Sequence, residues 1–203
     1  MSSIHVADGA AQERAKYAEI WSTVPEYRKY SPGLENVERF MSVLEPKVGS
    51  TVIDIGCGTG GAGLSLQNDH GLKSWWLDIT DAALDPGIER SRFIESPLWA
   101  PDWSVKHSGP LQVERRWDYG FCCDVLEHIP TEYAMLTVDR ILASCQTAWL
   151  QICLVPDEFG KKIGEPLHLT VKPFSWWLVR LATLGTVIDA RDLCGNGLYV
   201  VTR

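Results

Sequence analysis

Two patterns of apolar residues alternate along the chain. Short continuous runs are typical of buried strands, and stripes at spacings of three and four are typical of amphipathic helices. The run Thr51–Ile55 is the clearest strand signal, because it is mostly β-branched and apolar and a glycine-rich turn follows at once. Strands are predicted at residues 51–55, 74–77, 93–94, 117–123, 148–155, 186–189 and 198–202, and helices at 11–24, 33–44, 62–67, 81–88, 133–144 and 173–183. A frayed terminus is expected at residues 1–10, and irregular loops at 95–116 and 156–172.

This alternation predicts an α/β fold with a mostly parallel sheet and helices on both faces. The ending departs from the alternation, because only residues 190–197 separate the last two predicted strands. That stretch is too short for a crossover helix, so the last strand is expected to run antiparallel to its neighbour. A chain of 203 residues without internal repeats or long linkers fits one globular unit.

Charge and targeting signals narrow the function classes. The formal net charge of −7 disfavours tight binding to nucleic acid through its phosphates. No apolar run approaches the roughly 18 residues that span a bilayer, and the start MSSIHVADGAAQERAK has no apolar signal core. A cytoplasmic location away from membranes is therefore expected. The six cysteines form no CxxC pair and do not indicate a zinc site.

The most informative stretch is the glycine turn from Asp54 to Gly61, between a predicted strand and a predicted helix. Glycines let the backbone approach a ligand closely, and the helix start offers free N–H groups. A carboxylate two residues before the first glycine disfavours a phosphate and favours a cationic ligand. Asp78 lies 24 residues after Asp54, at the end of the next predicted strand, where doubly wound folds hold a ribose diol.

The stretch Asp54–Gly60 matches in full the D-x-G-x-G-x-G motif of the class I S-adenosylmethionine-dependent methyltransferases, and the chain resembles that family. The resemblance continues at Asp78-Ile79, at residues 118–130 with the D-V-L-E-H-I segment typical of the small-molecule type (methyltransferase-11 and -23 groups), and in the tail after Leu167. It covers about residues 37–203. The third motif, at residues 93–99, lacks the usual Gly-Asp/Asn signature.

The resemblance implies a Rossmann-like sheet of seven strands, mostly parallel, whose last strand is antiparallel. It also implies an N-terminal helical cap at residues 1–46, a methyltransferase domain at 47–203, and S-adenosyl-L-methionine as cofactor. By this resemblance, the methionine part of the cofactor lies near Asp54, Gly56 and Gly58, and Gly60 completes the loop. The ribose binds Asp78, and the adenine lies between Ile79 and the region of Leu98 and Trp99. The sulfonium lies beside Cys123 and Asp124.

The expected reaction is methyl transfer to an oxygen or nitrogen atom of a small-molecule acceptor. His128 and His168 are the candidate catalytic groups, because a histidine pKa lies near working pH and each lies in a loop after a predicted strand. Both histidines, together with Asp157 or Glu165, are conceivable metal ligands, but the spacing of these residues does not indicate a metal and no metal site is predicted.

Three other functions stay open. A nucleotide or nucleic acid is the alternative acceptor, since Trp99 and Trp103 in an irregular loop could stack a base. A chain that binds the cofactor without turning it over is a second alternative. A nicotinamide-dependent dehydrogenase is a third, although Asp54 before the glycines and the antiparallel last strand count against it. The acceptor and the oligomeric state are left open.

Overall fold

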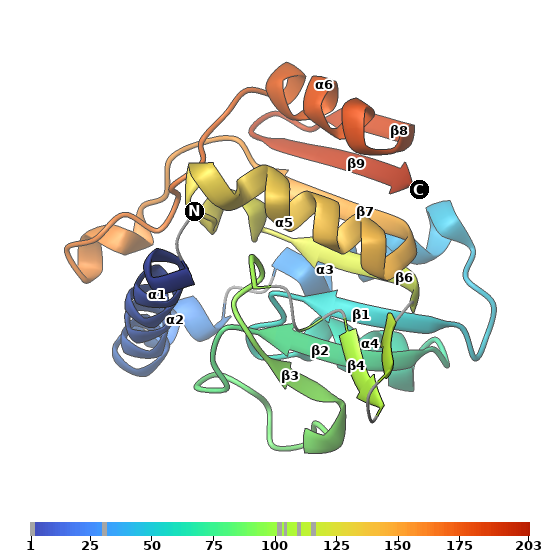
Figure 1. Cartoon of the computed structure of the whole chain (residues 1–203), viewed down its shortest axis with the longest axis horizontal. Helices are drawn as coiled ribbons and strands as arrows, with labels where there is room; N and C mark the ends of the chain where they lie inside the picture. Colours follow the sequence, from blue (N-terminus) through green and yellow to red (C-terminus); the bar gives the residue numbers. More distant parts are fainter. Residues whose placement is uncertain (1–2, 30–31, 101–102, 104, 109–110, 115–116) are drawn as a thin grey trace.

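The computed structural model describes residues 3–29, 32–100, 103, 105–108, 111–114 and 117–203. Its centre is a seven-stranded sheet with the strand order β3-β2-β1-β6-β7-β9-β8 (Figure 1). The strands are β1 Thr51–Ile55, β2 Lys73–Asp78, β3 Phe93–Glu95, β6 Trp117–Cys123, β7 Cys145–Cys153, β8 Thr186–Asp192 and β9 Asn196–Thr202. The pairs among β3, β2, β1, β6 and β7 are parallel, and β9 runs antiparallel to both of its neighbours. The predicted α/β sheet and its antiparallel last strand are confirmed.

Helices cover both faces of this sheet, as the alternation predicts. They are α1 Ser3–Thr23, α2 Pro25–Lys29, α3 Pro32–Leu44, α4 Gly61–Asn68, α5 Thr131–Ser144 and α6 Phe174–Leu184, with short 3-10 helices η1 Arg90–Arg92, η3 Leu126–His128 and η4 Phe159–Lys162. Helices α5 and α6 pack on one face, and α3 and α4 on the other (Figure 1). Helices α1 and α2 lie beyond the carboxyl ends of the parallel strands.

Alternation along the strands creates two hydrophobic layers. In β1, Ile53 and Ile55 belong to the layer under α5 and α6, whereas Val52 belongs to the layer under α3 and α4. The second layer centres on Phe40 of α3, whose ring packs edge-on against Phe121 and Trp149 at centroid distances of 5.3 and 5.9 Å. Both layers hold the carboxyl ends of β1 and β6 next to each other.

The predicted helix at residues 81–88 is wrong. This segment forms turns, because Pro86-Gly87 interrupts it and the Asp85 carboxylate accepts the backbone N–H of Gly87 (2.7 Å). Its apolar residues are buried without helical geometry: Leu84 and Ile88 pack against Trp76 of β2. Burial against a neighbouring strand therefore produced the apolar spacing that resembles a helix.

Two regions predicted to lack regular structure contain some. Residues 3–10, expected to be frayed, form the first turns of α1, which carry no proline. Within residues 95–116, Val105–Ser108 (β4) and Leu111–Glu114 (β5) form an antiparallel pair. The alternation of Leu111 and Val113 with polar residues is a strand signal, but a four-residue segment makes it weak.

Candidate functional site

A pocket opens at the carboxyl edge of the sheet, where the loops after β1, β2, β6 and β7 meet. Open α/β sheets bind ligands at such an edge, next to the strand where the order reverses. Of the ten residues predicted to contact the cofactor, nine line this pocket: Asp54, Gly56, Gly58, Asp78, Ile79, Leu98, Trp99, Cys123 and Asp124. Both predicted histidines, His128 and His168, line it as well.

The glycine turn folds tightly against the end of β2. The backbone N–H groups of Gly56 and Cys57 donate to the Leu77 carbonyl oxygen at 2.7 and 3.1 Å. Gly56 and Gly58 have φ of +67° and +54°, a region that side chains with a Cβ rarely adopt. A Cβ on Gly56 would lie 2.4 Å from Val125 in the β6 loop, so this position has no room for a side chain. The turn thereby presents backbone to the pocket.

Gly60 is the predicted contact residue that does not line the pocket. It stands at the N-cap of α4 with φ of +79°, and a Cβ there would lie 2.1 Å from the Ile88 side chain. Its carbonyl oxygen accepts the indole N–H of Trp76 at 3.1 Å. The structure therefore gives Gly60 a packing reason that the motif does not show.

Two buried carboxylates face the glycine turn. Asp54 is 4% exposed and accepts the Gly63 N–H of α4 at 2.9 Å, and Asp78 is 9% exposed and accepts the Gly58 N–H at 2.8 Å. Burial, which penalises the charged form, raises the pKa of Asp54 to about 7 and that of Asp78 to about 6. No described lining residue is a lysine or arginine, so this end of the pocket suits a cation.

The region predicted for adenine is apolar. Leu98 and Trp99 are buried, and the Trp99 ring stacks on Tyr133 with a centroid distance of 5.6 Å and an interplanar angle of 8°. Trp103 is 2% exposed, and its indole N–H donates to the Leu98 carbonyl oxygen at 2.9 Å. The suggestion that Trp103 could stack a base is wrong, since it supports the loop from inside instead.

The loop after β6 adds a third side. Asp124 has φ of +53°, its N–H donates to the Gln151 carbonyl oxygen at 3.0 Å, and its carboxylate accepts the Gln151 amide at 3.2 Å. Burial raises the pKa of Asp124 to about 6. Burial also raises the pKa of the Cys123 thiol, which stays uncharged in the pocket wall. The strained backbone at Asp124 directs the loop toward the pocket.

Aromatic side chains from α1, α2 and η4 cover the pocket. The ring of Trp21 lies 4.6 Å from that of Tyr27, which lies 5.5 Å from Phe159, and all three line the pocket with Tyr17. The Tyr17 ring meets His128 edge-on at 5.8 Å. The sequence shows Tyr17 and Trp21 at helical spacing, a pattern that equally predicts core residues, so it could not reveal this role for Trp21.

Two arginines hold this cover in place. Arg14 of α1 donates to the Ile79 carbonyl oxygen at 2.9 Å, and Arg28 of α2 donates to the carbonyl oxygens of Ala82 and Ala83 at 3.4 and 3.1 Å. Both arginines join the N-terminal helices to the loop after β2. Asp157, which the sequence analysis names only as a conceivable metal ligand, lines the pocket as well. The lining residues that sequence reasoning did not indicate are Glu13, Trp21, Gly33, Cys57, Thr59, Ala62, Val125, Ile129, Phe159 and Leu167.

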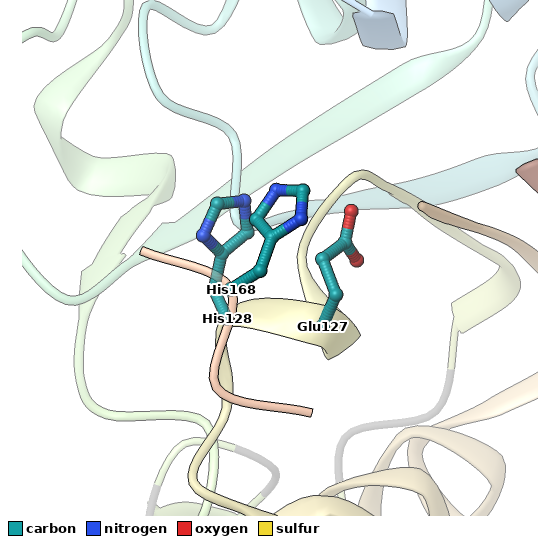
Figure 2. A group of neighbouring side chains, drawn as sticks. All are labelled: Glu127, His128 and His168. Atoms are coloured by element: carbon teal, nitrogen blue, oxygen red, sulfur yellow. The ribbon is translucent and has the colours of Figure 1, made fainter. Parts of the chain in front are cut away.

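The two histidines lie side by side next to Glu127 (Figure 2), at the end of the pocket formed by the loops after β6 and β7. Their rings meet edge-on with centroids 4.7 Å apart. The backbone carbonyl of Glu127 accepts the N–H groups of Leu169 and Thr170 at 2.7 and 2.8 Å, which brings the late loop onto η3. The geometry brings both histidines into one site, and their catalytic role stays a prediction.

Each imidazole is oriented by a backbone carbonyl. Nδ1 of His128 donates to Leu167 O at 3.1 Å, and Nδ1 of His168 donates to Val155 O at 2.6 Å. A carbonyl only accepts, so Nδ1 of each ring carries a proton, and Nε2 is the ring nitrogen that makes neither of these hydrogen bonds. Burial lowers the pKa of His128 to about 3, so this ring is neutral at physiological pH.

Glu127 is fully buried beside these rings. Its Oε1 accepts the Cys153 N–H at 3.0 Å, and its Oε2 has no hydrogen-bond partner. Burial raises the pKa of Glu127, and the nearby Asp124 charge adds to this rise. Glu127, His128 and His168 each offer one ligand atom within 4.8 Å of the others, and they form a group that could hold a metal ion.

Comparison with known proteins bears on the fold. The sequence matches no family model and no curated protein sequence. Magnesium protoporphyrin IX methyltransferase (ChlM) from Synechocystis, solved with bound S-adenosylhomocysteine, is similar with a TM-score of 0.57 and 18% identity over 84% of this chain and 81% of that chain. A Haloferax volcanii protein in complex with the Trm112 methyltransferase activator is similar with a TM-score of 0.64 and 12% identity, over 92% of this chain and 96% of that chain. CalO1, a methyltransferase in calicheamicin biosynthesis solved with S-adenosylhomocysteine, is similar with a TM-score of 0.56 and 16% identity, over 99% of this chain and 61% of that chain.

These similarities, all below 25% identity, establish the Rossmann-like class I methyltransferase fold for this chain. The order of the seven strands and the antiparallel β9 agree with it. The ChlM and CalO1 structures both contain S-adenosylhomocysteine. In the part of the chain that the structure describes, no helix is long and apolar enough to cross a membrane.

Proposed function

We propose that this chain binds S-adenosyl-L-methionine in the pocket and transfers its methyl group to an oxygen or nitrogen atom of a small-molecule acceptor. One observation carries the proposal: two buried carboxylates and a glycine turn line the same pocket as two oriented histidines, of which His128 is neutral. The first set suits the cationic cofactor, and the second suits an acceptor atom that must lose a proton.

The cofactor would lie along the carboxyl edge of the sheet. Its ribose hydroxyls would bind the Asp78 carboxylate, and its adenine would lie against Ile79, Leu98 and Trp99. The methionine part would follow the backbone of Gly56 and Gly58. The transfer is an in-line displacement, so the main contribution of the protein is alignment of the acceptor atom with the methyl carbon.

The charge of the pocket lining favours a small-molecule acceptor over nucleic acid. The described charged side chains that line the pocket are the acids Glu13, Asp54, Asp78, Asp124 and Asp157, apart from the two histidines. A phosphate backbone would be repelled by these groups.

The aromatic cover from α1, α2 and η4 encloses the site further, and we propose that α1 and α2 act as the cap of a methyltransferase domain. Free thiols at all six cysteines support the cytoplasmic location that we keep as an expectation.

A turnover assay tests the reaction. The chain is incubated with S-adenosylmethionine and a panel of hydroxylated compounds, carboxylic acids, amines and nucleotides, and release of S-adenosylhomocysteine is followed. Acceptor-dependent release with a methylated product supports the proposal. Binding of the cofactor with no release above background for any acceptor would favour the non-catalytic alternative.

The pH dependence of cofactor affinity follows from the raised pKa values of Asp54 and Asp78, which are about 7 and about 6. Below these values the carboxyls are neutral, and above them they attract the sulfonium. Affinity for S-adenosylmethionine is therefore expected to rise roughly tenfold from pH 5.5 to pH 7.5 and then level off. S-adenosylhomocysteine, which lacks the sulfonium charge, is the control and is expected to show a smaller rise in the same titrations. Equal pH profiles for the two ligands would contradict this account.

Replacing His168 by alanine is expected to lower turnover about 10- to 100-fold while changing cofactor affinity less than threefold, because general acid–base assistance of this size is lost at the acceptor end only. His70→Ala is the matched control, since His70 pairs with Glu38 (3.2 Å) and does not line the pocket. Turnover is measured at saturating acceptor. An active His168→Ala variant with unchanged kcat would remove His168 from the catalytic groups.

A further inference from the structure

The ring nitrogens of His128 and His168 lie beside Glu127 in an arrangement that suits a bound ion, and methyl transfer as proposed above needs no such ion. Both imidazoles use Nδ1 on a backbone carbonyl, so the hydrogen bonds to Leu167 O and Val155 O fix the rings and leave Nε2 as the nitrogen available to a ligand. Histidines that bind metals almost always donate their other N–H in this way. His128 and His168 lie 40 residues apart in the sequence, and their rings are adjacent and held in the same way, so they can provide two nitrogen ligands to one metal ion.

Glu127 supplies an independent observation. The residue is 0% exposed, yet its Oε2 has no hydrogen-bond partner, while Oε1 is held by the Cys153 N–H. A buried carboxylate oxygen without a partner is costly, and such groups call for an explanation such as an ion. The three ligand atoms lie within 4.8 Å of one another, and Figure 2 shows the carboxylate on the same side of η3 as both rings.

We propose that Glu127, His128 and His168 bind a divalent metal ion at the acceptor end of the pocket. Ligand atoms about 2.0–2.2 Å from one ion lie roughly 3–4 Å apart, so binding requires only a small inward shift of these side chains. The sequence does not predict a metal site, because the spacing of the two histidines with Asp157 or Glu165 carries no metal signal. The structure instead uses the Asp157 carboxylate to accept the backbone N–H groups of Gly160, Leu167 and His168.

The donor set selects the class of ion. Two imidazole nitrogens with a carboxylate suit first-row transition ions such as Mn²⁺, Fe²⁺ and Zn²⁺ better than Ca²⁺, which takes six to eight oxygen ligands. Three protein ligands leave coordination positions open, as in catalytic rather than structural sites. Asp124, which also lines the pocket, adds negative charge beside the cluster and favours a cation further.

The position of the ion deepens the proposed function and rests on it. His128 and His168 line the same pocket as the glycine turn, and Glu127 lies buried next to them, so an ion held by the three would lie at the pocket wall beside the space left for the acceptor. A divalent ion there would lower the pKa of a bound hydroxyl group, so the acceptor class is an alcohol or phenol. Each Nε2 would then bind the ion in place of taking a proton, and the histidines would assist the reaction through the ion. The hydroxyl would give its proton to water, an oxygen lone pair would form the bond to the methyl carbon, and the pair of the methyl–sulfur bond would stay on sulfur as S-adenosylhomocysteine forms.

The test is calorimetric titration of the chelator-treated full chain with MnCl₂ and, separately, ZnCl₂, in the absence of cofactor. We expect one ion per chain for at least one metal, and at least a tenfold loss of affinity in His168→Ala and in Glu127→Gln. Glu127→Gln keeps an oxygen for the Cys153 N–H, and His168→Ala changes a half-buried ring, so at least one variant is expected to fold. Cys194→Ser, which removes an exposed thiol able to bind Zn²⁺, is the control and is expected to bind as the parent does.

The outcomes separate this inference from the proposed function. Absence of binding, or binding that both folded variants retain at full affinity, overturns the metal site even if S-adenosylmethionine binds. Metal binding that the variants lose supports the site even if the cofactor does not bind, and in that case the proposed methyl transfer fails alone. With an active acceptor, loss of turnover in chelator and its return with the added ion further supports the site.

Discussion

Replacing Asp78 by alanine is expected to weaken the binding of S-adenosylmethionine about 10- to 100-fold. Hydrogen bonds to a charged group are worth about 1.5–3 kcal/mol, and each 1.4 kcal/mol is a factor of ten in affinity. The Asp78 carboxylate does two things in this account: it accepts the Gly58 N–H at 2.8 Å and so holds the glycine turn, and it would accept the ribose hydroxyls. Loss of the side chain removes both, and calorimetric titration measures the result.

A nearby aspartate provides the control for this variant. Asp85 is exposed, caps only the Gly87 N–H at 2.7 Å and does not line the pocket, so Asp85→Ala should bind the cofactor as the parent does. Thermal unfolding of each variant shows whether the fold is intact. A folded Asp78→Ala chain with the parent's affinity would remove Asp78 from the cofactor site.

Gly58→Val is expected to abolish detectable cofactor binding, a loss of more than about 100-fold, because overpacking of a tight site and backbone strain act together. Gly58 has φ of +54°, and a Cβ there would already lie 3.1 Å from the Trp21 ring. Two further methyl groups would fill the space between the turn and α1, which the methionine part of the cofactor would otherwise occupy.

Gly49→Val separates strain from obstruction. Gly49 has φ of +86°, and a Cβ there meets nothing within 4 Å, so this variant has the left-handed backbone penalty without any effect on the pocket. We expect Gly49→Val to unfold at a lower temperature than the parent and to bind S-adenosylmethionine normally. If folded Gly58→Val binds as tightly as Gly49→Val, the glycine turn is not the place where the cofactor lies.

Local sequence signals predicted the sheet and the cofactor end of the pocket well. The β-branched run of β1, the glycines and Asp78 are contiguous or lie at ends of neighbouring parallel strands, so their closeness follows from sheet geometry alone. The same logic failed at residues 81–88, where packing of Leu84 and Ile88 on Trp76 imitated helical spacing. Pro86-Gly87 was the signal that should have outweighed that spacing.

The acceptor end depends on tertiary contacts that no local pattern encodes. Trp21 belongs to a stripe of residues that equally predicts core, and its place over the pocket depends on distant contacts, among them those of Arg14 and Arg28 with the loop after β2. The meeting of His128 with His168 depends on the Glu127 carbonyl, which binds the late loop through backbone atoms. The metal-ligand role proposed for Glu127 depends on its burial and its unpaired oxygen, and neither is visible in a sequence.

The central claim is that the pocket binds S-adenosylmethionine, and calorimetric titration of the chain with S-adenosylmethionine and, in parallel, S-adenosylhomocysteine tests it most directly. The account predicts micromolar binding of both ligands with one site per chain, weakened in the Asp78→Ala variant. Absence of binding of either ligand to folded protein would contradict it, and the buried pair of Asp54 and Asp78 would then need another cationic ligand.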